Sequence, residues 1–504
     1  VSSMGKEEGV EAGMEGVLRG LSVDDKPLPS EQLDLVVRQV RFNPADSTFA
    51  VASARVEGEG MKVSVGQLEG ALGERLSLGG QANARARLET MTALLAPLAG
   101  LEQVPELAGL FVYEGEFTGE GPRVNLDGDG RIEQFSLHVV PEATPEQPNP
   151  EPVKVTEDRI DLAHHVVIDT EAESVLLKSF TIKSKQLLNF AASGRLEDYG
   201  GRRVLRDVKG DFSGAGNELM TVLEAFAPQL AQRLGITGPI SGEFTASGPA
   251  YQADATPAFR GVDAQATASW ERLTLTEIAL GQAKLVATLE NGLLEIKRTA
   301  MTAGEKGTLR LAAVVDFRTE EPTLIVPPKL VMLEDVPVRK QVGTVGLSWI
   351  LPIFYRPERL SGQITAEVIE EVRLPLGESI KTGGAGRVRL KVPGLKLHSK
   401  GVFTRLLSLG GLSGPQLLEI PSDTFVIKDG RIYLDDFSVM VGGLWDWKFT
   451  GWAGFDERIN MTVSVPVTPD LLSEFGVKLP ESGLSRVAEQ IQRVDIPQTG
   501  TRPP

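Results

Sequence analysis

The sequence predicts a mainly β protein with an extended, repetitive architecture, in which a few amphipathic helices cap or plug a sheet. The first observation behind this prediction is a strand signature that occurs three times, each time after an apolar, helix-like stretch that contains a proline. It reads YEGEFTG at Tyr113–Gly119, ISGEFTA at Ile240–Ala246 and LSGQITA at Leu360–Ala366. Repeated units of this kind stack on their neighbours and create long continuous surfaces.

The second observation is the alternation of apolar and polar residues, which is the period of a strand with one buried face. Phe180 and Ile182 are expected on one side of such a strand, with Thr181 and Lys183 on the other. The strongest alternation runs from Thr424 to Val467. The same pattern also occurs in closed β-sandwiches, so it does not decide whether the apolar face is open or filled by protein.

Composition excludes several functional classes. The 504-residue chain has a formal net charge of -16, which argues against a general nucleic-acid binder because phosphate backbones select clustered Lys and Arg. It has no cysteine, which excludes disulfides, thiolate nucleophiles and Cys-based zinc sites. Hydrolase-elbow, zincin and P-loop sequences do not occur in it. We therefore expect a non-enzymatic protein with no catalytic residues, no metal and no cofactor.

Two local patterns invite a metal interpretation. His164 and His165 are adjacent, and neighbours in a regular strand point to opposite faces, so the pair cannot chelate one ion. The segment Asn125–Gly130 reads NLDGDG, which spaces oxygen ligands like the first half of a calcium loop, but Ser136 stands where the bidentate Glu should be. A tight hairpin turn is the preferred interpretation of this segment.

Five segments are expected along the chain. They are a flexible polar segment at 1–30, a first β repeat at 31–155 with a helix near 88–101, a second at 156–334 with a helix near 217–234, a third at 335–467 that includes the C-terminal β region, and a C-terminal helix with a disordered tail at 468–504. A proline-rich stretch at 140–155 separates the first two repeats, and Pro228 should kink or split the second helix. Asn291-Gly292 and Asp429-Gly430 are expected to form hairpin turns.

With these elements in place, Gly401–Val467 resembles the C-terminal region of the AsmA-like family of bacterial envelope proteins, within the repeating β-groove lipid-transfer class. There, GVFTRLLSLGGLSG is followed by FVIKDGRIYLDDFSVMVGG and KFTGWAGFDERINMTVSVPV. The shared order is an apolar helix, a strand, an Asp-Gly turn, a second strand, and a Gly-rich strand that leads into a long alternating one. The repeats at Gly115, Gly242 and Gly362 extend a weaker similarity over most of the chain.

The resemblance implies an elongated, twisted antiparallel sheet curled into a groove. It implies a periplasmic protein that binds or conducts lipids between membranes, with phospholipid as the expected class, and that supports outer-membrane biogenesis. An inner-membrane anchor is expected before Val1, envelope proteins are expected as partners, and nucleic acid is not. The apolar-face residues offered as lipid-groove candidates are Phe180, Ile182, Phe425, Ile427, Phe437, Val439, Trp445, Trp447, Phe449, Met461, Val463 and Val465.

Two alternatives remain open at this point. The first is a structural or adhesive β-repeat protein of the cell envelope that associates through its acidic outer face. The second is an enzyme acting on polysaccharide, which rests only on the abundance of carboxylates, because the sequence gives no pair whose placement can be argued. The sequence leaves the lipid, the direction of transport and the oligomeric state undetermined.

Overall fold

The computed structural model describes most of the chain. The described residues are 10–19, 22–23, 26–27, 32–72, 76–92, 106–141, 150–226, 228–231, 234–250, 259–275, 278–319, 321–338, 359–398, 416–441, 443, 445–466 and 493–501. Over these residues the protein is mainly β, and 26 strands are hydrogen-bonded into one antiparallel sheet. This confirms the fold class expected from the repeats and the alternation.

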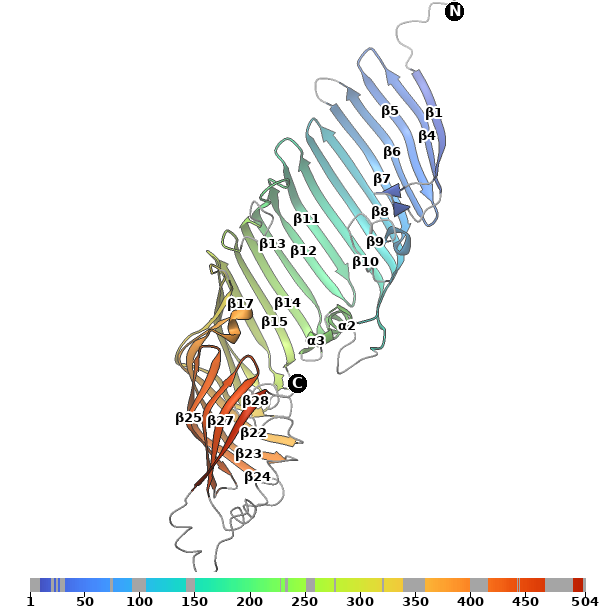
Figure 1. Ribbon diagram of the computed structural model, residues 1–504. Helices are drawn as coiled ribbons and strands as arrows, with labels where there is room; N and C mark the ends of the chain where they lie inside the picture. Colours follow the sequence, from blue (N-terminus) through green and yellow to red (C-terminus); the bar gives the residue numbers. More distant parts are fainter. Residues whose placement is uncertain are drawn as a thin grey trace, which may run out of the picture. The chain divides into compact units, whose positions relative to one another are not determined.

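The chain divides into two compact units, Val1–Ala268 (unit 1) and Ser269–Pro504 (unit 2). In unit 1, each strand pairs with the next one along the chain, and the strands lie side by side in that order (Figure 1). They are β1 (Val10–Arg19), β4 (Gln32–Asn43), β5 (Thr48–Gly58), β6 (Met61–Leu72), β7 (Leu76–Arg87), β8 (Glu106–Glu120), β9 (Arg123–Val139), β10 (Val153–Asp169), β11 (Ser174–Ser184), β12 (Leu188–Glu197), β13 (Val204–Ala215) and β14 (Leu234–Pro249). The short strands β2 (Ser22–Val23) and β3 (Lys26–Pro27) pair with each other in a separate two-stranded sheet.

The register gives unit 1 one apolar face and one polar face. Two rows of directly paired residues define the apolar face across β4 to β14. The first row is Leu35, Val56, Val63, Ala84, Tyr113, Gly130, Leu162, Ile182, Phe190, Phe212 and Gly242. The second row is Val37, Ala54, Val65, Ala82, Gly115, Gly128, His164, Phe180, Ala192, Gly210 and Phe244.

The row between these two belongs to the polar face. It consists of Val36, Arg55, Ser64, Asn83, Glu114, Asp129, Ala163, Thr181, Ala191, Asp211 and Glu243. Neighbouring residues of a strand point to opposite faces, so the charged side chains of this row stay off the apolar face. The predicted separation of Phe180 and Ile182 from Thr181 and Lys183 is confirmed.

Glycines on the apolar face make room for aromatic rings that lie over the neighbouring strand. A Cβ atom at Gly242 would lie 2.5 Å from Cε1 of Phe212, and one at Gly80 would lie 2.9 Å from Cζ of Phe117. Gly210 stands in the same relation to Phe244. Rings that cover glycines in this way restore cross-strand contact where a side chain is missing. The glycine-aromatic alternation of the repeat signature therefore builds the floor of the apolar face.

Two short helices follow β13 and cap one end of the apolar face. They are α2 (Gly216–Phe226) and α3 (Pro228–Ala231), which lie at the ends of β10 to β14 (Figure 1). α2 contacts β10, β13 and β14, and its 11 residues give it a length of about 16 Å, close to the roughly 19 Å that separates the first and last of these strands. α2 ends at Phe226 and α3 begins at Pro228, and residue 227 between them lies outside the described residues, so the predicted kink or split at Pro228 stays a prediction.

Unit 2 continues the pattern of antiparallel neighbours. β15 (Asp263–Leu275) contains the boundary between the units. It is followed by β16 (Ile278–Leu280), β17 (Ala283–Glu290), β18 (Leu293–Ala303), β19 (Gly307–Asp316), β20 (Thr323–Val326), β21 (Leu330–Val338), β22 (Arg359–Pro375), the short 3-10 helix η3 (Glu378–Lys381), β23 (Ala385–His398), β24 (Gln416–Lys428), β25 (Arg431–Val441), β26 (Trp445–Gly454), β27 (Arg458–Pro466) and β28 (Arg493–Thr501).

Unit 2 has a dense hydrophobic core, and among the described residues the buried cluster draws on this unit alone. Phe437, Phe449 and Leu395 are completely buried within one cluster that draws on β22 to β27 and on earlier strands. Trp270 joins the same cluster and donates its indole N–H to the carbonyl of Gly281 at 3.1 Å. The apolar face of unit 2 is therefore packed by protein.

Two predicted hairpin turns are confirmed. β17 and β18 are joined by Asn291 and Gly292, and β24 and β25 by Asp429 and Gly430, all four with φ between 51° and 76°. Two-residue turns with positive φ at both positions match the twist of the strands they join, which explains the Asn-Gly and Asp-Gly sequences.

Several sequence predictions differ from the structure. Asn125–Gly130 is not a hairpin turn but the interior of β9, where Gly128 and Gly130 lie on the apolar face and Asp127 and Asp129 on the polar face. The reason is that alternating Asp and Gly also satisfy the period of a strand whose glycines lie beneath rings from β8.

The tail expected to be disordered contains β28, which pairs with β27, and the segment expected to be flexible contains β1. Most of the helix near 88–101, the apolar helix expected in GVFTRLLSLGGLSG and most of the C-terminal segment at 468–504 with its expected helix lie outside the described residues.

Replacing Gly242 by Ala should destabilise unit 1 by about 1–3 kcal/mol, because the new methyl group would overlap the Phe212 ring and the carbonyl of Thr267. The control is Gly119→Ala in β8, where the nearest atom to a Cβ is the carbonyl oxygen of Arg123 at 3.6 Å. Urea denaturation followed by far-ultraviolet circular dichroism measures both variants. Equal stability of the two would contradict the proposed role of the glycine.

Truncation of Phe449 to Ala should destabilise unit 2 by about 3–5 kcal/mol, because the side chain is completely buried. All five tryptophans of the chain lie in unit 2, at 270, 349, 445, 447 and 452, so tryptophan fluorescence follows its unfolding selectively. Leu376→Ala, at a side chain that is 52% exposed, should cost less than about 1 kcal/mol. A comparable loss from both variants would show that the core does not determine the stability of this unit.

Candidate functional site

The apolar face of unit 1 is the candidate site, because its large side chains remain partly exposed. Phe180, Phe190 and Phe244 are all accessible in part, and Phe190 contacts the other two rings at centroid distances of 6.3 Å (Phe180) and 6.0 Å (Phe244). Towards β1, accessibility increases, to 53% at Met14 and 45% at Leu18. Exposed apolar surface of this extent marks a binding surface more often than a structural one.

The face is long as well as apolar. Eleven consecutive described strands contribute to the two rows that define it, and strands in a sheet are spaced about 4.8 Å apart. The rows therefore extend about 48 Å along the sheet of unit 1, and neither contains an Asp, Glu, Lys or Arg residue. A linear apolar molecule could lie along such a surface.

The twelve residues predicted to line a groove fall into two groups. Phe180 and Ile182 belong to the partly exposed rows of unit 1. The remaining ten lie in unit 2, where Trp445 is partly buried and packs against the core. The other nine are core residues: Phe425, Ile427, Phe437, Val439, Trp447, Phe449, Met461, Val463 and Val465. A role of any of the twelve in lipid contact stays a prediction, and the partly accessible members are Phe180, Ile182 and Trp445.

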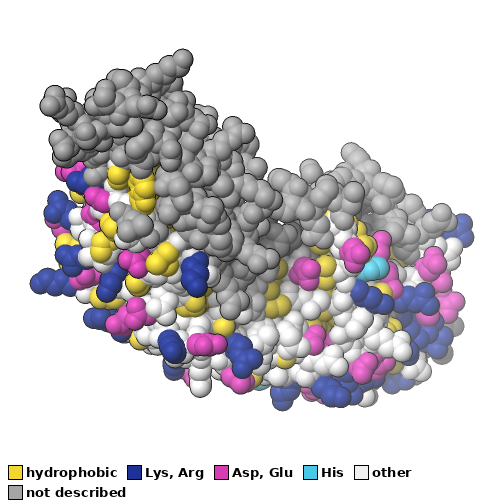
Figure 2. All heavy atoms as spheres, turned by 90° about the horizontal axis from the view of Figure 1, so that it is seen from below, with side chains coloured by type: hydrophobic (Ala, Val, Ile, Leu, Met, Phe, Trp, Pro, Cys, Tyr) yellow, Lys and Arg dark blue, Asp and Glu magenta, His cyan; other side chains and the backbone are white. Residues whose placement is uncertain are grey.

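The polar face carries interspersed charges of both signs, and Figure 2 shows such a mixture over the visible surface with hydrophobic side chains between. Arg131 pairs with Glu133 at 2.7 Å, and Arg206 pairs with Glu197 at 2.9 Å. Exposed pairs of this kind contribute at most about 1 kcal/mol each. The main effect of these charged side chains is to keep the polar face in water. The opposite face of each strand is then the one that carries the apolar residues.

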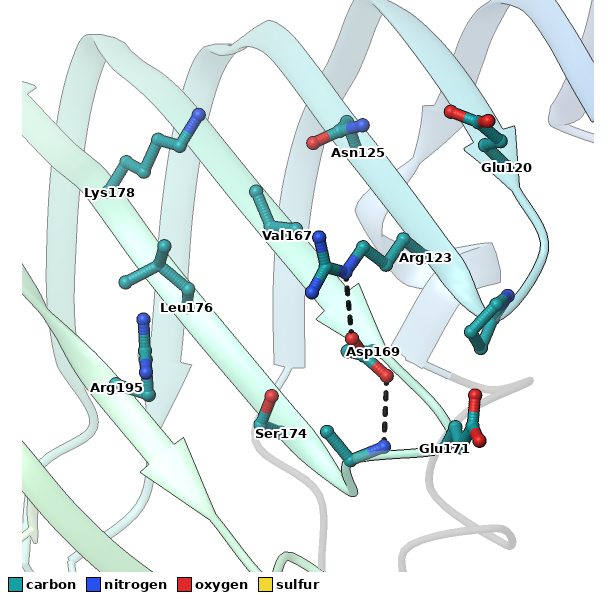
Figure 3. Close-up of a pocket in the computed structure, with 12 residues that line it drawn as sticks. Glu120, Arg123, Asn125, Val167, Asp169, Glu171, Ser174, Leu176, Lys178 and Arg195 are labelled. Carbon is teal, nitrogen blue, oxygen red and sulfur yellow. Dashed lines mark hydrogen bonds and ion pairs between the residues drawn. The ribbon is translucent and has the colours of Figure 1, made fainter.

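The polar face contains one open pocket of about 870 Å³ over β9 to β12 (Figure 3). Arg123 donates to Asp169 at 2.9 Å, and the amide of Ala172 first and this guanidinium second hold the pKa of Asp169 below its usual range. Lys178 and Arg195 also line the pocket, and so do the carboxylates of Glu120 and Glu171. Three cations against three carboxylates give it no charge preference for an ion.

Comparison with family models, curated proteins and solved structures found no match to this chain. In the part of the chain that the structure describes, no three His, Asp or Glu side chains gather in a way that could hold a metal ion. Within those same residues, the helices are all too short or too polar to cross a membrane.

One polar pair lies inside the apolar face. Tyr113 of β8 and His164 of β10 share a hydrogen bond of 3.0 Å between Oη and Nε2, and their ring planes are nearly parallel, at 6° to each other. Burial raises the pKa of Tyr113, and the carboxylates of Asp127 and Asp129 raise it further, so the phenol stays protonated. His165, the next residue, lies on the polar face 3.0 Å from Asp127. The prediction that the two histidines point to opposite faces is confirmed.

A buried carboxylate organises the capped end of the apolar face. Glu157 of β10 is 3% exposed and accepts hydrogen bonds from Ser184 Oγ at 2.5 Å and from the amides of Gln186 and Leu187 at 2.9 and 3.2 Å. Burial alone would raise the pKa of this carboxyl, but these hydrogen bonds together lower it. The contacts fix the turn between β11 and β12, which lines a cavity of about 660 Å³ beside the start of α2.

Sequence reasoning missed both the Tyr113–His164 pair and Glu157. Their partners lie 51 and 27 residues away, so no local spacing reveals them. A weak signal is present in each case, because a Glu or His that falls on the apolar period of a strand must find a partner when it is buried. The alternation around 157 and 164 was therefore the available signal.

Replacing Glu157 by Gln should destabilise unit 1 by about 1–3 kcal/mol, since charged acceptors form the stronger hydrogen bonds. The folded pKa of Glu157 lies below its unfolded value, so its contribution to stability is present above the unfolded pKa and is lost as pH falls through the folded one. Denaturation at pH 7 and at pH 3, with hydrogen exchange of residues 184–188, measures the effect. The difference between parent and variant should shrink at pH 3, and a constant difference would contradict the assignment.

Proposed function

We propose that this protein is non-enzymatic and binds acyl lipids, with phospholipid as the expected class, along the apolar face of unit 1. The observation that carries the proposal is the pair of uncharged rows that cross eleven described strands while their large side chains stay partly exposed. The rows are longer than an extended sixteen-carbon chain. Such a chain could therefore lie on them without meeting a charged side chain.

The energetics favour a lipid over a compact ligand. Burying a methylene is worth about 0.8 kcal/mol, so shielding a sixteen-carbon chain from water is worth about 12 kcal/mol. An open sheet face supplies that shield along its whole length while a polar headgroup stays in water. The absence of a charge preference in the pocket of the polar face supports the view that binding energy comes from the apolar face.

The cellular role is part of the same proposal. The resemblance of Gly401–Val467 to the AsmA-like family favours a periplasmic protein anchored in the inner membrane of a bacterium with an outer membrane. There it would bind or conduct lipid between the membranes with envelope proteins as partners, and so support outer-membrane biogenesis. Unit 2, whose apolar face is filled by its own side chains, would then serve as a packed body rather than as a lipid surface.

Lipid extraction and mass spectrometry of the purified protein test this function. The parent protein should co-purify with phospholipid or take it up from vesicles, and the double variant Phe180→Asp, Ile182→Asp should lose most of it, because two carboxylates would then interrupt the adjacent apolar rows. Circular dichroism establishes that the variant is folded.

The matched control is Thr181→Asp with Lys183→Asp, which places the same two carboxylates on the opposite face of the same strand. It should bind lipid like the parent protein. Loss of lipid in both double variants would mean that β11 tolerates no charge, and absence of lipid from the parent would favour the alternative of a structural or adhesive β-repeat protein.

A further inference from the structure

Tyr113 and His164 occupy the middle of the apolar face, where their neighbours are uncharged and mostly apolar. Tyr113 lies in the first row between Ala84 and Gly130, and His164 lies in the second row between Gly128 and Phe180. The two polar atoms that meet here are 3.0 Å apart. A part-buried polar pair costs stability unless its buried atoms find partners, so its presence on this surface calls for a reason.

The local backbone is built to place the phenol. Cβ atoms at Gly115 and Gly128 would each lie 2.7 Å from Cζ of Tyr113, so the ring can lie across the sheet only because both positions are glycine. This orientation directs Oη to the imidazole of His164, whose ring plane lies within 6° of that of the phenol. The phenol ring therefore lies over one glycine of its own strand, β8, and one glycine of the neighbouring strand, β9.

The unpaired nitrogen of His164 determines where the protons lie. Nδ1 is buried and has no hydrogen-bond partner, whereas Nε2 contacts the phenol. Buried N–H groups without an acceptor are rarer than buried acceptors without a donor, which favours the tautomer with its proton on Nε2. Nε2–H then donates to Oη of Tyr113. The phenolic proton, which cannot also point at this nitrogen, is left to donate to a third group.

We infer that the Tyr113 hydroxyl donates to an ester carbonyl oxygen of an acyl lipid lying on the apolar face, with His164 as the positioning residue. This inference rests on the proposed function. An ester carbonyl is a neutral acceptor attached directly to the acyl chain, so it can follow the chain onto an apolar surface at modest desolvation cost. A phosphate would require a cation, and the two rows that define the face contain no Lys or Arg.

The test is a competition between two phosphatidylcholines with identical sixteen-carbon chains, one joined to glycerol by esters and the other by ethers. The purified full-length protein is incubated with vesicles of an equimolar mixture, reisolated, and analysed by mass spectrometry. The parent should be enriched in the diester lipid about threefold to tenfold, the effect of one neutral hydrogen bond. Tyr113→Phe should bind both lipids with an enrichment near one.

Two further variants separate this role from a structural one. His164→Phe keeps an aromatic ring but removes the group that orients the hydroxyl, so it should reduce the enrichment while uptake of the diether lipid persists. Tyr199→Phe makes the same chemical change as Tyr113→Phe in the turn between β12 and β13, away from the two rows, and should leave the enrichment at the parent value.

The outcomes are distinct. Uptake of neither lipid by the parent would overturn the proposed function together with this inference. Equal uptake of both lipids by the parent would overturn the inference alone and leave the function standing. An equal loss of both lipids in Tyr113→Phe would show that the hydroxyl supports the fold and does not bind the ester carbonyl. That result would also overturn the inference.

Discussion

Every property of unit 1 depends on the register of its antiparallel strands. A strand shifted by one residue would bring its charged row to the apolar face and its aromatic rings to the polar face. The row that begins at Leu35 and the row that begins at Val36 are adjacent along every strand, yet one has no charged residue and the other includes Arg55, Glu114 and Asp129. The register is thus specified by burial on one side and by hydration on the other.

Glycine-ring complementarity strengthens this specification. Gly242 faces Phe212 and Gly210 faces Phe244, so each ring needs a glycine on the neighbouring strand at its own position. A slip would bring side chains beneath the rings and leave the glycines uncovered. Because the rings then lie along the sheet, the floor stays low and continuous, which is what a binding surface for an extended apolar molecule requires.

Both units alternate apolar and polar residues along their strands, but the apolar faces differ in how far they are buried. In unit 2, Phe437 and Phe449 are completely buried, whereas the rings of Phe180 and Phe190 in unit 1 remain partly exposed. Alternation determines that a strand has an apolar face, but what covers that face depends on segments distant in the sequence. This is why the sequence predicted the sides of Phe180 and Ile182 and the turn at Asp429-Gly430, but could not separate filled positions from accessible ones.

The misread segment Asn125–Gly130 has the same cause. Its composition is that of a turn, and only the rings of Phe111 and Tyr113 on the adjacent strand make it a strand. Likewise, the pair formed by Tyr113 and His164 depends on β9 lying between their strands, which no local pattern encodes. Local sequence patterns therefore predict most of the strands, whereas the contacts that each strand makes depend on residues of the neighbouring strands.

An open apolar face carries a thermodynamic consequence. Large exposed apolar surfaces favour association with anything that covers them, and a ligand that binds only the folded state stabilises it by mass action. A lipid on the two rows would therefore raise the stability of unit 1, while unit 2, whose core is already complete, would gain nothing directly. In this arrangement a bound lipid would supply for unit 1 the second layer that side chains supply for unit 2.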